Sequence, residues 1–229
     1  MILRPDEKAS TIRRYEERLE KHGISPRAMG WRDREQQYMR FLILTEIGDV
    51  TNRAVLDVGC GFGDLCEFLK SRNLAVKYTG YDISKKLVDI AKGRHPEATF
   101  RVVDISEETV NATFDYVFSS GIFNASMSAN EDFMETMVAR CFDLCTIGVA
   151  VNMMSKYVDY EDETLYYYSP EKVLAFCKTL TKRVTLRHDY MPYEFTVYLY
   201  KNDEVNERNV FVQASTELNG FNLSVSCGQ

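Results

Sequence analysis

The residues best suited to chemistry in this chain are glycines at every second position of one short turn. Gly59, Gly61 and Gly63 follow an apolar run that ends in the acid Asp57. Glycine lets the backbone approach a ligand closely and adopt conformations that are closed to other residues. A helix that begins directly after the turn would present its positive N-terminal end to the same ligand. The order of strand, glycine turn and helix therefore predicts a nucleotide-binding loop.

Two further acids lie where a nucleoside needs hydrogen-bond acceptors. Asp82 comes 19 residues after Gly63 and ends the segment 77–82, whereas Asp104 follows the segment 99–103. An acid at the end of the second strand can accept both ribose hydroxyls. An acid after the third strand can accept from an adenine amino group. Because parallel strands end at one edge of a sheet, we expect the loop and both acids to form one site.

The elements that must position these residues alternate between strands and helices from residue 54 onward. We expect strands at 54–57, 77–82, 99–103, 116–119 and 148–153, and helices at 65–72, 85–93, 130–144 and 170–180. This alternation is typical of a parallel, doubly wound α/β sheet. The last two strands, 183–189 and 194–201, are joined by a link so short that they must be antiparallel.

Two helices are expected before this alternating region, and capping residues mark several helix ends. The first helix spans about 6–21 and stops at Gly23, and the second follows Trp31. Ser128 lies three residues before Glu131, which indicates a capping box for the helix at 130–144. We divide the chain into a helical cap (1–50), a core (51–201, with an insertion at about 155–169) and a C-terminal extension (202–229).

Together, the loop, the acids and the closing hairpin resemble the class I S-adenosylmethionine-dependent methyltransferase family over roughly residues 50–201. The resemblance implies a Rossmann-like seven-stranded, mostly parallel sheet with an antiparallel terminal hairpin and an N-terminal helical lid. It assigns the amino end of S-adenosylmethionine to Asp57, its ribose to Asp82 and its adenine to Asp104. The cofactor-binding residues expected on this basis are Asp57, Gly59, Gly61, Gly63, Asp82, Ile83, Asp104, Ile105, Ser120, Trp31 and Arg40.

In that family the end of the fourth strand, here 119–124, faces the reactive methyl group. This segment lacks the Asn/Asp-Pro-Pro-Tyr/Phe clamp of many nucleic-acid and protein N-methyltransferases. The N-terminal lid would bring Trp31 and Arg40 to the methionine end, where Arg40 would meet the carboxylate or remain a solvated helix residue. The substrate-binding residues that we expect are Phe123, Asn124, Tyr157, Tyr168 and Tyr190.

His188 is the best candidate for a catalytic base, because it lies beside Asp189 and Tyr190 and can titrate near neutral pH. The alternative is a histidine at the end of a hairpin, hydrogen-bonded to backbone. Displacement at the methyl carbon of a sulfonium needs mainly alignment and desolvation. A base is therefore useful for a hydroxyl acceptor and dispensable for many amines.

Composition narrows the classes of partner. The chain has 229 residues, of which 45% are hydrophobic, and no uninterrupted apolar stretch reaches about 18 residues. With a charged N-terminal segment, this argues against membrane insertion and favours a cytoplasmic protein. The net charge of −6 argues against a nucleic-acid substrate. The six cysteines are scattered, and Cys141 and Cys145 lack further ligands nearby, so we expect buried thiols and no metal.

These features predict methyl transfer from S-adenosylmethionine to an oxygen or nitrogen of a small or medium metabolite, such as a secondary metabolite or a glycan precursor. We expect a monomer or homodimer. A protein or RNA methyltransferase is the main alternative, but the acidic stretch 158–163 disfavours it. A non-catalytic S-adenosylmethionine-binding module would show a degraded loop. A nicotinamide-dependent enzyme would show Gly-x-Gly-x-x-Gly spacing instead.

Overall fold

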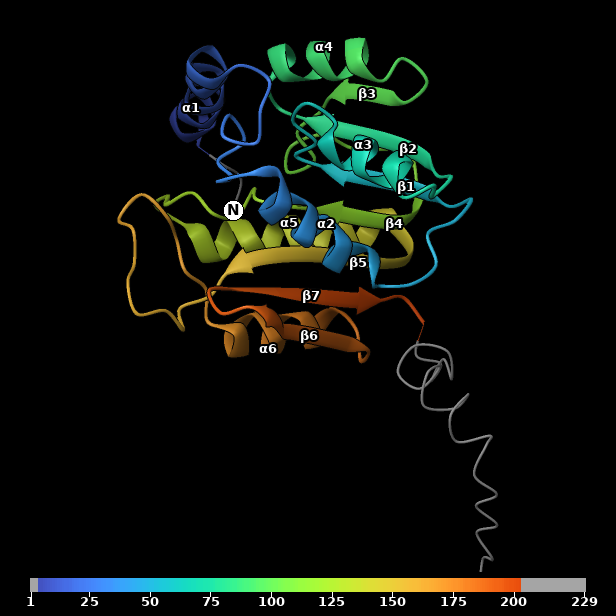
Figure 1. The fold of residues 1–229 in the computed structure, drawn as a ribbon. Helices are drawn as coiled ribbons and strands as arrows, with labels where there is room; N and C mark the ends of the chain where they lie inside the picture. The colour runs from blue at the N-terminus through green and yellow to red at the C-terminus, as the bar shows by residue number, and fades with distance from the viewer. Residues whose placement is uncertain (1–3, 203–229) are drawn as a thin grey trace, which may run out of the picture.

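Seven strands form one mixed sheet in the order β3-β2-β1-β4-β5-β7-β6 (Figure 1). The computed structural model describes residues 4–202. The strands are β1 (Ala54–Val58), β2 (Lys77–Asp82), β3 (Thr99–Val102), β4 (Phe114–Ser119), β5 (Cys145–Met154), β6 (Val184–Met191) and β7 (Glu194–Tyr200). Only β7 is antiparallel to its neighbours, β5 and β6. The predicted fold class, including the antiparallel hairpin, is confirmed.

Helices cover both faces of the sheet. They are α1 (Pro5–His22), α2 (Arg34–Thr45), α3 (Asp64–Ser71), α4 (Lys85–Arg94), α5 (Asn130–Leu144) and α6 (Pro170–Leu180). One core joins α2, α3 and α4 to the sheet, and a second core joins α5 and α6 to the opposite face. In β1, Val55 belongs to one core and Leu56 to the other. The central strands are therefore apolar throughout, as expected for a parallel sheet covered on both sides.

Several helix boundaries follow local capping. The Ser84 and Ser169 side chains accept from the backbone of the first turns of α4 and α6, and α1 ends at Gly23 with a positive φ of 62°. The predicted capping box at Ser128 is wrong. That serine donates from its N–H and its Oγ to Glu7 of α1, at 2.9 and 2.8 Å, and the N-cap of α5 is the next residue.

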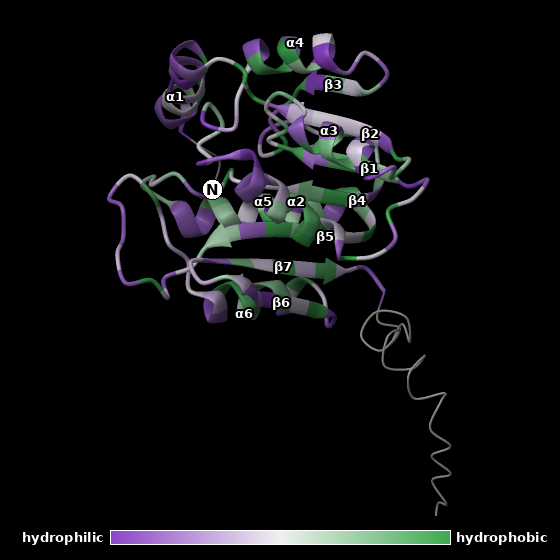
Figure 2. Cartoon of the chain, viewed as in Figure 1, coloured by the Kyte–Doolittle hydropathy of each residue, from purple (hydrophilic) through white to green (hydrophobic). Residues whose placement is uncertain are grey.

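Helix α1 lies over the carboxyl edge of the sheet and is hydrophilic over most of its surface (Figure 2). Near its C-terminal end, Leu19 packs with Phe62 and Leu87 in a small separate core. Polar contacts hold the rest of the helix, among them Glu16 Oε1 accepting from Ser84 Oγ at 2.9 Å. The predicted lid helix is thus attached by a short apolar end and a longer polar side.

Helix α2, expected within the N-terminal cap, packs on β5 as part of the helical layer. The division into cap, core and extension stays a prediction, and the extension beyond Asn202 lies outside the described residues. Among the helices between residues 4 and 202, none is both long and apolar enough to cross a membrane.

Candidate cofactor and acceptor site

A pocket opens where β1, β2, β3 and β4 end, and α1 covers it. Strand ends and the turns after them supply one set of lining residues, which includes Asp57, Gly59, Gly61, Asp64, Asp82, Ile83, Asp104, Ile105, Ser120, Gly121 and Ile122. The N-terminal segment and the start of α5 supply Thr11, Ile12, Tyr15, Met29, Trp31, Gln37, Met127 and Phe133. Most of the expected cofactor residues therefore share one pocket.

The glycine turn requires glycine for two separate reasons. Gly59, Gly61 and Gly63 have φ values of 79°, 52° and 78°, a region that other residues rarely adopt. A Cβ on Gly61 would also lie 2.6 Å from the Met29 sulfur, which means that the link between α1 and α2 lies directly against the turn. Gly63 is the N-cap of α3, so the helix points its N-terminus at the turn, as expected.

Asp82 binds the turn itself. Its Oδ2 accepts from the Gly61 N–H and its Oδ1 from the Ser84 N–H, both at 2.9 Å. Burial raises the pKa of the Asp82 carboxyl, although these backbone donors oppose the shift. The acid expected to bind ribose therefore also ties the end of β2 to the glycine turn.

Asp104 is bonded on one oxygen and ion-paired on the other. Oδ1 accepts from the backbone and hydroxyl of Ser106, at 3.0 and 2.6 Å. Oδ2 forms an ion pair with Lys8 Nζ of α1 at 2.6 Å. Burial alone would raise the pKa of this carboxyl, but bonds from Lys8 and Ser106 lower it. Asp104 therefore lines the pocket as a carboxylate that Lys8 of α1 already holds in place.

Asp57 is buried behind the turn and accepts from the Tyr78 hydroxyl at 2.5 Å. Burial raises its pKa to about 7, the Tyr78 hydrogen bond opposes the shift, and the Asp82 and Asp64 charges reinforce it. Its charge near neutral pH therefore depends on what lies in the pocket.

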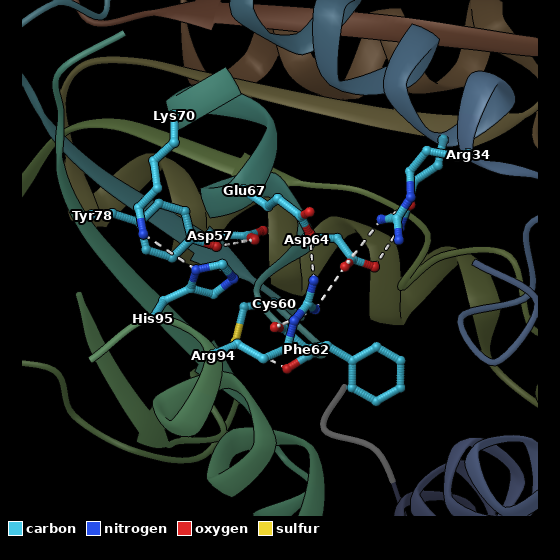
Figure 3. Close-up of polar contacts among 12 residues, drawn as sticks. Arg34, Asp57, Cys60, Phe62, Asp64, Glu67, Lys70, Tyr78, Arg94 and His95 are labelled. Atoms are coloured by element: carbon cyan, nitrogen blue, oxygen red, sulfur yellow. Dashed lines mark hydrogen bonds and ion pairs between the residues drawn. The ribbon is translucent and has the colours of Figure 1, made fainter. Parts of the chain in front are cut away.

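Asp64, at the first position of α3, is a further acid beside the turn. Its carboxylate accepts from Gln37 of α2 at 2.9 Å and pairs with Arg94 at 2.8 Å and Arg34 at 3.2 Å, as Figure 3 shows for the two arginines. Although burial raises the pKa of Asp64, these partners lower it overall. This network joins α2 and α4 to the cofactor turn.

At the end of β4, Trp31 lies between Gly121 and Arg40. A Cβ on Gly121, whose φ is 89°, would lie 2.9 Å from Trp31 Cζ2, and the Arg40 guanidinium lies 4.3 Å from the centre of the indole ring. Arg40 also pairs with Glu194 at 2.7 Å, and both side chains are buried. Arg40 therefore supports Trp31 from behind and does not line the pocket, which corrects our expectation that it meets a cofactor carboxylate.

Two of the expected substrate residues belong to the core. Phe123 and Tyr168 are buried and make an edge-to-face ring contact with centroids 6.5 Å apart. The Tyr168 hydroxyl donates to the Asn130 carbonyl at 3.3 Å. The reason is that the insertion folds back, with Ser155 and Tyr168 paired by a β-bridge, so this tyrosine faces α5. The structure places both residues outside the pocket lining.

Tyr157, Tyr190 and His188 lie on the insertion and the terminal hairpin, where His188 packs on Tyr157 and Phe195, and Tyr190 packs against the core on the α2 side. Tyr157 is 54% exposed and donates to Glu171, whereas the Tyr190 hydroxyl bonds Glu194 and Thr196. His188 Nε2 lies 3.2 Å from the Pro192 carbonyl oxygen. Within the described residues, none of the three side chains lines the pocket. His188 contacts backbone, which was the expected alternative to a catalytic base.

Asn124 keeps an open role. Its Oδ1 is buried and finds no hydrogen-bond partner within the described chain. Ser120, which lines the pocket, accepts at Oγ from Asn152 Nδ2 at 3.1 Å. Asn152 was missed from the sequence, where a polar residue inside the apolar run of β5 was the available signal. Met29, Gln37 and Ile122 were also missed, because nothing local distinguishes them.

Behind the turn, Cys66, His95 and Glu97 place ligand atoms within 4.8 Å of one another. Lys70 Nζ lies 3.3 Å from His95 Nδ1 and forms an ion pair with Glu97, so an ammonium group already occupies this cluster (Figure 3 shows the Lys70–His95 contact). A metal would have to displace that charge, and we assign none here. The five cysteines within residues 4–202 are free and buried.

Comparisons with known proteins agree with this geometry. Residues 55–148 match the family described as "Methyltransferase domain". The protein Rv1506c of Mycobacterium tuberculosis, provisionally named a methyltransferase, is 30% identical over 155 residues, which cover 65% of this chain and 93% of that protein.

Solved structures share the fold. The DhpI–SAH complex has a TM-score of 0.61 at 16% identity and aligns with 83% of this chain and 95% of its own. The magnesium protoporphyrin IX methyltransferase of Synechocystis with bound SAH has a TM-score of 0.56 at 16% identity, over 73% of this chain and 83% of that one. This chain therefore shares its fold with two proteins whose structures contain S-adenosylhomocysteine.

Proposed function

Because this chain belongs to the class I S-adenosylmethionine-dependent methyltransferase family, we propose that it methylates an oxygen or nitrogen of a small or medium metabolite, such as a secondary metabolite or a glycan precursor. The enzyme class and the cofactor follow from the family. The acceptor class is the proposal, and the pocket under α1 supports it.

The main observation for cofactor binding in this pocket is that acids lie at the ends of three strands around one glycine turn. Asp82 would receive the ribose hydroxyls, the turn the methionine part, and Asp104 the adenine amino group. Asp104 lines the pocket after β3, and its Oδ2 would serve that last role while it also pairs with Lys8. The residues present therefore fit S-adenosylmethionine.

When bound, the cofactor would supply a methyl group on a positively charged sulfur; an acceptor lone pair would take the methyl group, the neutral thioether would leave, and the acceptor proton would pass to solvent. The contribution of the chain is to align and desolvate the two reactants. Trp31 and Ser120 lie at the β4 end, where the family presents the methyl group, and α1 lies over the pocket. No described side chain in the pocket is placed as an obligatory base, so a neutral amine or a readily ionised hydroxyl suits the site.

The cofactor part of the proposal is tested by titration calorimetry with S-adenosylmethionine. Asp82→Ala should weaken binding at least about ten-fold, because it removes the ribose acceptor and the bond to Gly61 together. Asp89→Ala is the matched control, since that aspartate is exposed on α4 and pairs with Lys85. An unchanged affinity in the Asp82 variant would refute the assigned site.

The acceptor part is tested with methyl-labelled cofactor and cell extract. Extract is separated into metabolite, protein and RNA fractions before incubation with the enzyme. We expect label in the metabolite fraction, in a product heavier by one methylene group. Label confined to protein or RNA would replace the metabolite proposal with a macromolecular acceptor.

A further inference from the structure

The lid side of the pocket is apolar and partly exposed. We define the lid-side wall as Ile12, Tyr15, Met29, Trp31, Ile122 and Met127. All six side chains are intermediate in exposure, although each is apolar or aromatic. Partly exposed apolar side chains that line a concave site offer apolar surface to a ligand. Trp31 aside, our cofactor assignments leave these residues without a role.

The charges of the pocket are all of one sign. Among the described lining residues there is no Lys, Arg or His, and the ionisable acids are Asp57, Asp64, Asp82 and Asp104. These acids lie on the strand ends and the glycine turn, which is the side assigned to the cofactor. The lid-side wall therefore offers no positive group to an acceptor.

Four basic side chains next to the pocket are already paired with acids. Lys8 contacts Asp104 and Glu107, at 2.6 and 2.8 Å, and Arg40 pairs with Glu194 at 2.7 Å behind Trp31. Arg34 and Arg94 both bind the carboxylate that begins α3. An anionic acceptor would have to break one of these pairs, and the acid left behind would be buried without its partner.

We infer that the acceptor enters the pocket with an uncharged, apolar body and that acceptors bearing carboxylate or phosphate are excluded. An anion against the lid-side wall would lose its hydration and gain no cation. A cationic acceptor would lie beside the sulfonium of the cofactor, which disfavours it as well. This inference rests on the proposed function, because it concerns the acceptor part of the same pocket.

Three phenols that differ only in the charge of their tail test the inference. They are 4-ethylphenol, 3-(4-hydroxyphenyl)propanoate and tyramine, which are neutral, anionic and cationic at pH 7. Each is titrated into the full chain saturated with S-adenosylhomocysteine, and binding is followed by saturation-transfer NMR. The neutral phenol should bind at least about ten-fold tighter than the propanoate, and tyramine should lie between them or match the propanoate.

A charge introduced into the wall gives a second measurement. Met29→Lys should raise the affinity for the propanoate at least about five-fold, because it supplies the missing cation at similar side-chain length. Met39→Lys is the control, since Met39 is 37% exposed on α2 and lies outside the described pocket lining. The control should leave the ranking of the three phenols as it is in the wild type.

Two outcomes would overturn the inference. One is a propanoate affinity equal to or above that of 4-ethylphenol. The other is saturable binding of none of the three phenols while S-adenosylhomocysteine stays bound, because an apolar acceptor wall should hold the neutral phenol. Failure of S-adenosylhomocysteine to bind at all would instead refute the cofactor site of the proposed function, so the two failures are distinguishable.

Discussion

Replacement of Asp57 by asparagine should change how stability depends on pH. Asp57 is 4% exposed, and burial raises its pKa from 3.8 to about 7, although the Tyr78 hydroxyl donates to it. A carboxyl whose folded pKa lies above its unfolded pKa binds its proton more tightly in the folded state. Its contribution is therefore fully present below about pH 4 and is lost as pH rises towards 7.

The magnitude follows from the two pKa values. Each unit of difference corresponds to about 1.4 kcal/mol, so the full effect is about 4 kcal/mol. Between pH 5 and pH 7 the unfolded carboxyl is already ionised while the folded one still holds most of its proton. In that window the free energy of unfolding of the wild type should fall by about 2 kcal/mol relative to Asp57→Asn.

Urea unfolding of both proteins without cofactor, at pH 5, 6, 7 and 8, measures this difference. Any constant cost of the asparagine cancels when the two proteins are compared across pH. A constant difference between the wild type and Asp57→Asn from pH 5 to 7 would show that the carboxyl is ionised in the folded protein. That result would refute the reasoning from burial. Tyr78→Phe, which removes the hydroxyl donor, should move the transition to higher pH.

Three further substitutions test the lid, the buried pair and the turn. Lys8→Met removes the bond to Asp104, so amide hydrogen exchange in the first turns of α1 should quicken about five-fold, while the last turns keep their protection. Arg40→Met should cost about 3–5 kcal/mol in urea unfolding, because Glu194 is left buried, and Glu194→Met in the same chain should restore part of it. Gly61→Ala should weaken cofactor binding about ten-fold by calorimetry, since φ is 52° and the methionine sulfur lies 2.6 Å from a Cβ; normal affinity would argue against a tight turn.

The cofactor half of the site could be predicted because local rules determine it. A glycine turn after a buried strand, and acids at the ends of the next two, need only the rule that parallel strands end at one edge. Asp82 and Asp104 lie there as expected. What local pattern could not show is that Asp82 also bonds Gly61, since this depends on how the turn closes over β2.

The acceptor half depends on contacts between distant parts of the chain. Arg40 and Glu194 are 154 positions apart, and they meet because antiparallel β7 begins at the edge where β5 ends. Sequence order predicted the hairpin but not the position of β7 between β5 and β6. Tyr168 was expected in the pocket because it is aromatic and close to a strand end, yet the return of the insertion turns it into the core. Ser128 likewise bonds α1, which no neighbouring residue reveals.

The stack of Gly121, Trp31, Arg40 and Glu194 joins four positions that selection would have to treat as one. A larger side chain at 121 displaces the indole, which uncovers the guanidinium and disturbs its acid. A substitution at one of these positions alone would therefore lower stability before it changed acceptor specificity. Replacing the positions together would avoid the destabilised single variants. We expect these four positions to covary among relatives of this chain, and libraries meant to widen the range of acceptors should randomise them together.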